Sequence, residues 1–429
     1  MLRRAALAAL IGLAAVAFAA CGGADAPAGP RTIRVPADEP TIQQGVDAAR
    51  PGDIVLVAPG VYAEGVHVDV AGITVRGEDR NRVILDGGDR IQNGFWVTAD
   101  RVAIENLTVR RFASNGILFT RLGQDVLEQV ESEDGGDTAT RDAVDPSKDL
   151  LDGYRASYVT AYDNGLYGLY AFASANGVFE HAYASGHPDS GFYVGQCRPC
   201  NAVLRDVTAE RNAIGYEGTN ASGGVFIVES LFTRNRLGIT PNSQDAELLA
   251  PQAETVVAGN RVIDNADPAT PEIDSGYFGG GILIGGGERN LVLRNLVTGN
   301  PDTGIGVYTL GRYQPSGNRI EGNVATGNGV DLVFAPVGTA DAAANCFVGN
   351  TFGTSLPRRI ERVLPCGRPS ALARFPAPPR TPVPPGVDYT SIPAPPPQPQ
   401  MPASAMAARG GAGAVPPRID VAAIAVPTP

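Results

Sequence analysis

A glycine followed by an apolar residue recurs through the middle of the chain at a nearly constant interval. Successive intervals are 23 or 24 residues, apart from one of 43, and the repeats begin at Gly168, Gly191, Gly215, Gly238, Gly281 and Gly304. A unit of this length cannot bury an apolar face alone, so neighbouring units must cover one another. The spacing therefore predicts a solenoid of short coils, with an insertion in the long interval.

Asparagines repeat in step with the glycines. They form pairs five residues apart at Asn260/Asn265, Asn295/Asn300 and Asn323/Asn328, with Ser230/Asn235 in the same position. We expect these columns to stack as ladders between coils. Short β-branched and apolar stretches separate them, such as residues 225–228 and 291–293, and stretches of this kind form strands. Each coil should therefore hold three short strands and three turns.

The unit N-x-x-x-x-N followed by G-[IFYL], repeated between about Asn81 and Asn350, resembles the right-handed parallel β-helix, or pectin-lyase-like, superfamily. The resemblance implies an all-β, right-handed parallel β-helix solenoid over residues 32–367. Residues 41–49 read as a short amphipathic helix that begins with a threonine and caps the open N-terminal end.

The motif G-x-Y-x-E at residues 60–64 is similar to a motif of pectin methylesterases. The later esterase motifs Q-D-T-L and D-F-I-F-G are absent. The polygalacturonase motifs G-H-G and R-I-K and the pectate-lyase motif R-x-P-x-x-R are absent as well. The resemblance thus implies a fold but no named activity.

Residues 1–23 have the composition of a bacterial export signal, with Arg3 and Arg4 before an apolar run that is too short to span a membrane. Phe18-Ala19-Ala20-Cys21 resembles a lipobox, in which Cys21 would carry the lipid, although Phe18 departs from the usual leucine. The alternative is cleavage after Ala19, which gives a secreted protein. We therefore expect an exported chain, either anchored to a membrane through Cys21 or secreted, with a linker at residues 24–31.

The chain has five cysteines. If Cys21 is lipidated, an even number remains, which suits an oxidising compartment. We expect disulfides between Cys197 and Cys200 and between Cys346 and Cys366.

Two insertions and a tail interrupt the repeat. Residues 121–152 carry ten acidic and three basic residues; a calcium-binding flap and a solvated loop are both open readings. The second insertion, residues 241–280, should line a groove. Residues 368–429 form a Pro/Ala-rich tail with 13 prolines between 369 and 402. We expect this tail to be disordered or extended, lying along the solenoid or serving as a spacer.

The net charge of −11 argues against a nucleic-acid partner and against direct contact with anionic membranes. A lipid on Cys21 would be the only membrane attachment. We expect a monomer with no cofactor, apart from calcium at the acidic insertion if that insertion is a flap.

In each coil the residue after the repeat glycine should point inward and the next residue outward. The outward column contains Trp96, Tyr170, Tyr193 and Glu217, and Asn220, Asn242 and Tyr308 lie near it. Strands of successive coils stack about 4.8 Å apart, so aromatic rings on several coils could contact successive sugars of a glycan. The alternative is ordinary strand surface covered by residues 121–152.

The densest polar patch holds His187, Asp189, Arg198 and Glu217. A lyase or epimerase acting on a uronate needs a base, His187 or Tyr193, and a cation, Arg198. A hydrolase needs two carboxyls, Glu217 with Asp189. His187 can equally be a surface turn residue, because Pro188 follows it.

Two functions remain open. The first, slightly favoured because family motifs are missing and histidines are few, is an exported protein that binds an extended polysaccharide along the outward strand face. The alternative is a polysaccharide lyase or epimerase acting on a uronate-containing glycan, with hydrolysis third.

Overall fold

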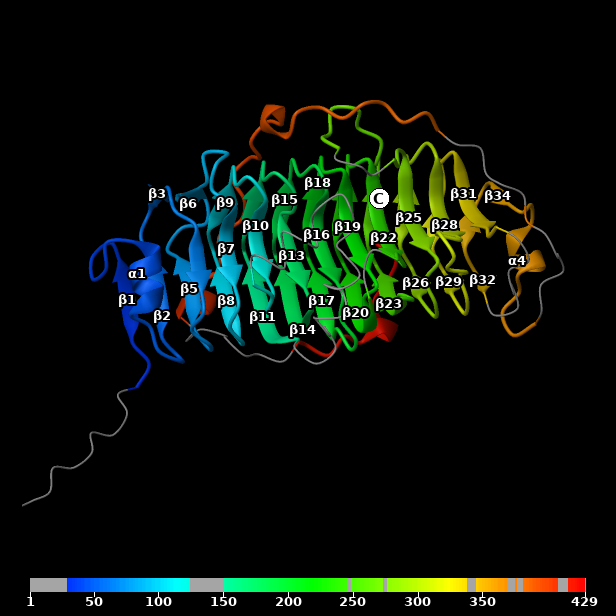
Figure 1. Ribbon diagram of the computed structural model, residues 1–429. Coiled ribbons are helices and arrows are strands. Elements are labelled where there is room, and N and C mark those ends of the chain that lie inside the picture. The colour runs from blue at the N-terminus through cyan, green and yellow to red at the C-terminus, as the bar shows by residue number, and fades with distance from the viewer. Residues whose placement is uncertain are drawn as a thin grey trace, which may run out of the picture.

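The computed structural model describes residues 29–123, 150–245, 248–272, 276–337, 345–368, 375, 381–407 and 416–428. Three parallel sheets of 12, 11 and 11 strands wind into one elongated solenoid (Figure 1). The predicted export signal, Cys21 and most of the acidic insertion lie outside the described residues. Among the described residues no helix has the length and apolar character needed to span a membrane.

Each coil contributes one strand to each sheet. Sheet A contains β1 (Thr32–Val35), β2 (Ile54–Val57), β5 (Thr74–Gly77), β8 (Val102–Glu105), β11 (Leu151–Ser157), β14 (Ser174–Glu180), β17 (Ala202–Arg205), β20 (Ser222–Val228), β23 (Ala253–Ala258), β26 (Leu291–Leu293), β29 (Arg319–Glu321) and β32 (Cys346–Val348). Sheet B contains β3 (Gly60–Tyr62), β6 (Val83–Asp86), β9 (Thr108–Arg110), β12 (Thr160–Tyr162), β15 (Tyr183–Ser185), β18 (Thr208–Glu210), β21 (Leu231–Thr233), β24 (Arg261–Ile263), β27 (Leu296–Thr298), β30 (Val324–Ala325) and β33 (Thr351–Phe352). Sheet C contains β4 (Val66–Val68), β7 (Asn93–Val97), β10 (Asn115–Phe119), β13 (Leu169–Phe172), β16 (Ser190–Gly195), β19 (Ile214–Thr219), β22 (Leu237–Asn242), β25 (Gly280–Gly285), β28 (Thr303–Tyr308), β31 (Val330–Ala335) and β34 (Ser355–Leu356).

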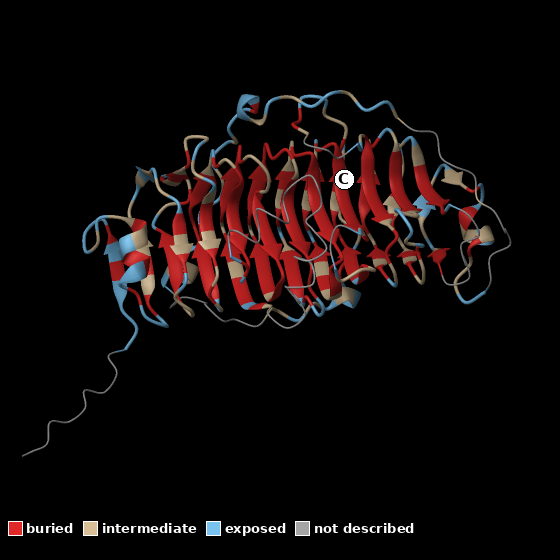
Figure 2. Ribbon diagram, in the orientation of Figure 1, coloured by how far each residue is buried: buried red, intermediate tan, exposed pale blue. Residues whose placement is uncertain are grey.

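The predicted register is confirmed in sheet C. The inward residues pair coil to coil in the order Leu169, Phe192, Tyr216, Ile239, Ile282 and Ile305. All six are completely buried and form part of one core that runs the length of the solenoid (Figure 2). Burial of this continuous column is what holds neighbouring coils together.

Close contact between coils explains the repeat glycine. A Cβ on Gly215 would lie 2.5 Å from the carbonyl oxygen of Gly238 in the next coil, and a Cβ on Gly238 would lie 2.6 Å from that of Gly281. Only glycine allows two backbones to approach this closely.

The asparagine columns form the predicted ladders. In one of them Asn260 Nδ2 donates to Asn295 Oδ1 (3.0 Å), and Asn295 Nδ2 donates to Asn323 Oδ1 (2.9 Å). A parallel ladder runs through Asn212, Asn235, Asn265, Asn300 and Asn328. These amides satisfy buried turn groups that the sheets leave unpaired.

The two ends of the solenoid carry short helices. At the N-terminal end α1 (Ile42–Asp47) begins after Thr41, whose side chain accepts a hydrogen bond from Gln44 N (3.1 Å). At the other end α4 (Ile360–Val363) buries Ile360. The disulfide between Cys346 and Cys366 ties the segment after α4 to β32. Both predicted disulfides are confirmed, the other joining Cys197 to Cys200.

The C-terminal tail lies back against the solenoid (Figure 1). Residues 381–407, which include η2 (Tyr389–Ser391) and α5 (Ala403–Ala407), run along one edge toward the N-terminal coils. Thr381 N donates to Asp302 Oδ1 (2.9 Å), while Asn81 exchanges two hydrogen bonds with Gln398 (2.8 and 2.9 Å).

Residues 416–428, with η3 (Val421–Ala423), lie against sheet A. Ile424 is only 7% exposed and packs with Val228, Val256 and Leu293. Of the two alternatives for the tail, disordered or extended, the described residues fit the second: they are mainly extended and hydrogen-bonded to the coils.

Candidate functional site

The outward column of sheet C has the predicted register. Trp96, Leu118, Tyr170, Tyr193, Glu217 and Thr240 occupy equivalent positions on successive coils. Tyr170 and Tyr193, however, are each only 3% exposed. Their rings meet edge to face with centroids 4.9 Å apart, and Tyr167 stacks on Tyr170 at 4.2 Å.

These rings belong to one apolar cluster with Leu118, Leu122 and Phe172, against which Leu150 packs. Leu122 and Leu150 come from the two ends of the predicted acidic insertion. The prediction of an open aromatic platform at Tyr170 and Tyr193 is therefore wrong, because both rings are buried against neighbouring side chains. The rest of the insertion lies outside the described residues.

At one end of the predicted binding stripe, Trp96 packs against this cluster, whereas Tyr308 at the other end belongs to a second one. Trp96 stacks on His67 with centroids 4.3 Å apart. Tyr308 packs with Ile214, Leu237 and Leu283, and its hydroxyl lies 2.9 Å from Thr303 Oγ1. Among the described residues the stripe thus falls into two apolar clusters, one that includes Trp96, Tyr170 and Tyr193 and one that includes Tyr308.

Where the aromatic column ends, two carboxyl groups meet. Glu217 projects from β19, and Asp189 lies in the turn before β16. Their side chains meet at the hydroxyl of Ser190. The Ser190 hydroxyl lies 2.7 Å from Asp189 Oδ1 and 3.3 Å from Glu217 Oε2, so it bridges the pair.

Neutral donors surround the Glu217 carboxylate. Asn242 Nδ2 donates to Glu217 Oε1 (2.8 Å), and Thr219 Oγ1 donates to the same oxygen at 3.4 Å. On the Asp189 side, Tyr167 provides a further hydrogen bond. Glu217 is 8% exposed, whereas Asp189 is half-buried and reaches the surface.

Burial, and next the charge of Asp189, raise the pKa of Glu217 to about 8 against the lowering effect of hydrogen bonds from Asn242, Ser190 and Thr219. Burial also raises the pKa of Asp189, while hydrogen bonds from Ser190, Tyr167 and Glu217 lower it. Two carboxyls this close cannot both ionise freely. The pair therefore holds one proton near neutral pH, which gives one acid and one base side by side.

A loop fixed at both ends supports the pair. Gln244 lies within reach of Glu217 Oε1 (3.5 Å) and is held by Asn220, which donates to Gln244 O (2.9 Å) and accepts from Gln244 N (3.1 Å). Asn220 thus positions a neighbour of the carboxyl pair.

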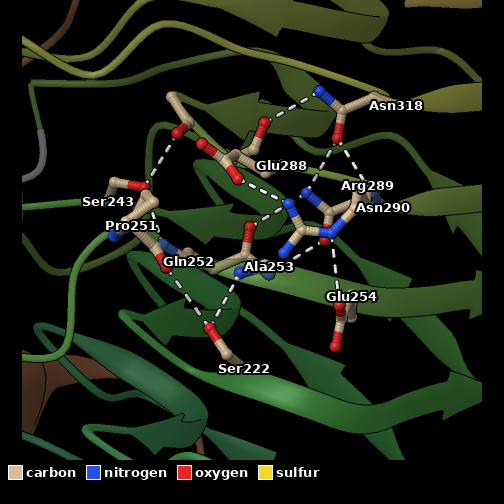
Figure 3. A network of polar contacts seen from close by, with 12 residues as sticks. Ser222, Ser243, Pro251, Gln252, Ala253, Glu254, Glu288, Arg289, Asn290 and Asn318 are labelled. Atoms are coloured by element: carbon tan, nitrogen blue, oxygen red, sulfur yellow. Dashed lines mark hydrogen bonds and ion pairs between the residues drawn. The ribbon is translucent and has the colours of Figure 1, made fainter. Parts of the chain in front are cut away.

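Figure 3 shows how the same loop is anchored. Gln252 N donates to Ser243 Oγ (2.9 Å), and the Ser222 hydroxyl accepts from Ala253 N (3.0 Å). Gln252 then joins a ladder with Asn290, whose Nδ2 donates to Asn318 Oδ1 (2.9 Å).

His187 is not at the carboxyl pair. It is completely buried, with Nδ1 2.7 Å from Asn212 Oδ1 and Nε2 3.1 Å from Asn164 Nδ2. Burial lowers its pKa to about 4. Both ring nitrogens are engaged in the asparagine ladder, so the predictions of a base and of a surface turn residue are both wrong.

The Arg198 guanidinium likewise binds other groups, the backbone carbonyls of the loop after β22. Its Nη2 donates to the carbonyl oxygens of Leu249 (2.8 Å) and Pro251 (2.6 Å). The guanidinium holds the loop after β22, so the prediction of a cation that neutralises a uronate at the site is wrong.

The sequence prediction missed Tyr167 and Gln244. The repeat could have identified Tyr167, because Tyr167 precedes the repeat glycine Gly168 just as Ser190 precedes Gly191. The register therefore places Tyr167 one coil from Ser190. Gln244 carries no such signal, because it lies beyond the end of β22.

Among the described residues no group of three or more histidine, cysteine, aspartate or glutamate side chains is placed to hold a metal ion. The calcium-binding reading of residues 121–152 concerns a segment that is largely outside the described part of the chain.

A family model described as "Right handed beta helix region" matches residues 143–325. The comparison with curated proteins finds no match. Several solved structures are similar. The A-module of Azotobacter vinelandii mannuronan C-5 epimerase AlgE4 has 14% identity and a TM-score of 0.45, and the match covers 73% of this chain and 91% of that one.

An alginate lyase from Paenibacillus sp. strain FPU-7 has 15% identity and a TM-score of 0.41, with 76% and 97% of the two chains covered. For pectate lyase Pel9A the values are 13%, 0.44, 76% and 80%. Likeness at this level carries no argument about the activity of this chain.

Proposed function

We propose that this protein is a polysaccharide-active enzyme in which Asp189 and Glu217 transfer protons to and from the substrate. The single observation that carries the proposal is the carboxyl pair bridged by the Ser190 hydroxyl, of which Asp189 is only half-buried. A carboxyl whose pKa lies near neutral pH can donate a proton under conditions in which an ordinary glutamate is fully ionised.

The chemistry follows from the single proton that the pair holds. The protonated carboxyl can donate to a leaving oxygen, while the ionised carboxyl accepts a proton from the attacking group. Ser190 and Asn242 fix both groups in place (2.7 Å to Asp189 and 2.8 Å to Glu217), so little reorganisation is needed during the reaction.

The polysaccharide class rests on the sequence resemblance and on the coil geometry. Parallel strands about 4.8 Å apart present an extended ligand with a repeating surface. A purely binding function has less support, because the aromatic residues that it required, Tyr170 and Tyr193, are buried.

The test is a screen of the purified full chain against polysaccharides, with three readouts: absorbance of unsaturated products, new reducing ends, and NMR of sugar configuration. We expect turnover that falls by about 10²–10⁴-fold in Glu217→Gln and Asp189→Asn, the range typical of a lost acid or base. The matched control is Glu210→Gln, since Glu210 lies in sheet B and binds Tyr183 Oη (2.8 Å). Turnover that survives both site variants would refute the proposal.

A further inference from the structure

The groups around the carboxyl pair carry no positive charge in the described part of the chain. The pair is contacted by Tyr167, Ser190, Thr219, Asn242 and Gln244, which are hydroxyls and amides. Such groups can donate hydrogen bonds to sugar hydroxyls and accept hydrogen bonds from them. They do not compensate an additional negative charge.

Two arginines are bonded to the loop that contains Gln244. Arg198 donates to the carbonyl oxygens of Leu249 and Pro251. Arg312, beyond Gln244 on the exposed rim, forms an ion pair with Asp245 (2.9 Å) and lies over the ring of Tyr313. Neither guanidinium is directed at Glu217 or Asp189 by any of these contacts.

A uronate bound here would bring a third carboxylate beside two carboxyls. Like charges within a few ångströms in a partly buried site repel strongly, because little water screens them. Removal of the proton beside a uronate carboxylate also needs a cation to stabilise the resulting charge. The described residues around the pair supply no such cation.

Resting on the proposed function, we propose that the site takes an uncharged, hydroxyl-rich sugar and that the reaction is hydrolysis. The ionised carboxyl takes a proton from water as the water oxygen bonds to the electrophilic carbon. The protonated carboxyl gives its proton to the oxygen that leaves. The pair ends with one proton, as it began, and no oxidant or reductant is required.

The two carboxyls meet at one hydroxyl, Ser190 Oγ (2.7 and 3.3 Å), whereas glycosidase pairs stand on either side of the sugar bond, roughly 5–9.5 Å apart. Both groups therefore act from one side of the substrate, on a glycosidic or an ester bond. Reducing ends report the first kind of bond, and released acid reports the second.

The decisive experiment compares uronate polymers with the same polymers after chemical reduction of each carboxyl to CH2OH. The reduced polymer carries a neutral hydroxymethyl group where the uronate carries its negative charge, and the rest of the sugar is the same. We expect the full chain to hydrolyse and bind the reduced polymer about tenfold or more better than the charged one. Equal or better use of the charged polymer, with or without added calcium, would overturn the inference.

Binding to the Asp189→Asn/Glu217→Gln double variant gives a second, independent readout. Removing the negative charge of the pair should raise its affinity for the uronate polymer and leave that for the reduced polymer nearly unchanged. If the full chain turns over neither polymer, the proposed function fails, while the difference in binding still tests the inference. If charge alters binding in neither protein, the inference fails.

Discussion

His187 occupies the ladder position that Asn212 holds in the next coil, and its Nδ1 lies 2.7 Å from Asn212 Oδ1. The imidazole also contacts Asn164 on the preceding coil (3.1 Å). One histidine thus continues a column that is otherwise built of asparagine amides from residue 164 to residue 328.

Replacing His187 by asparagine should preserve the ladder, because an amide can donate to one neighbour and accept from the other. Replacing it by alanine should lower the free energy of unfolding by about 2–4 kcal/mol, since a cavity and two unpaired amides remain. Chemical denaturation of the two variants beside wild type checks this. Equal destabilisation by both would contradict the ladder role.

Burial of His187 also predicts that the folded protein loses stability at low pH. The pKa of His187 is lowered by burial to about 4, so the unfolded chain binds a proton between about pH 6.5 and 4 that the folded chain does not. Stability should fall as pH drops through this window, and His187→Asn should remove that part of the fall. Thermal unfolding from pH 7 to pH 4 measures it, and parallel curves would exclude the effect.

Glu217 should make stability depend on pH in the opposite direction, with stability lost as the pH rises. Its pKa is raised by burial to about 8, so the folded state retains a proton that the unfolded state loses above about pH 4.5. Stability is complete below that pH and declines as pH rises through 8. Glu217→Gln should flatten the decline, whereas Glu210→Gln should not; equal slopes in both variants would contradict the assignment.

The disulfide between Cys346 and Cys366 closes a 20-residue loop at the C-terminal end of the solenoid. Chain entropy predicts that replacing both cysteines by serine lowers the free energy of unfolding by about 3 kcal/mol. The Cys197–Cys200 loop has a sequence separation of 3, so the corresponding double variant should lose less. Urea titration measures the free energy of unfolding of both double variants. A larger loss in the Cys197/Cys200 variant than in the Cys346/Cys366 variant would contradict this account.

Ile424 is the buried one of three apolar residues, with Ile419 and Val421, through which the end of the tail packs on sheet A. Ile424→Asp should release residues 416–428, because an aspartate cannot be buried beside Val228 and Leu293 without a partner. Limited proteolysis should then cut this segment faster than in wild type. Val383→Asp, at a tail residue that is 42% exposed, is the matched control and should leave the rate unchanged.

The coil period could be predicted from the sequence because its causes are themselves periodic. Gly215 and Gly238 repeat because backbones approach closely there, and Asn260 and Asn295 repeat because their amides bond to one another. Each cause favours one residue type at one position per coil, although His187 and Ser230 take the place of asparagine in two coils. The disulfides followed from cysteine parity.

The site was less predictable, because its geometry depends on segments without a period. Glu217 was identified by its column, but its contact with Asp189 depends on the path of a turn. Arg198 seemed free because its partners, Leu249 and Pro251, lie about 50 residues later in a loop. The burial of Tyr193 likewise depends on neighbours such as Leu122 from the edge of an insertion.

The docked tail changes how the solenoid should come apart. In a simple repeat protein each coil contacts only its neighbours, so the ends fray independently and stability adds up coil by coil. Here one segment connects Asp302 with Asn81, and a later one binds Arg294 through the carbonyl of Ile424 (2.5 Å). Opening an N-terminal coil therefore also requires release of a strap held by distant coils. Amide hydrogen exchange should accordingly show the two halves of the stack opening together rather than as a gradient from each end.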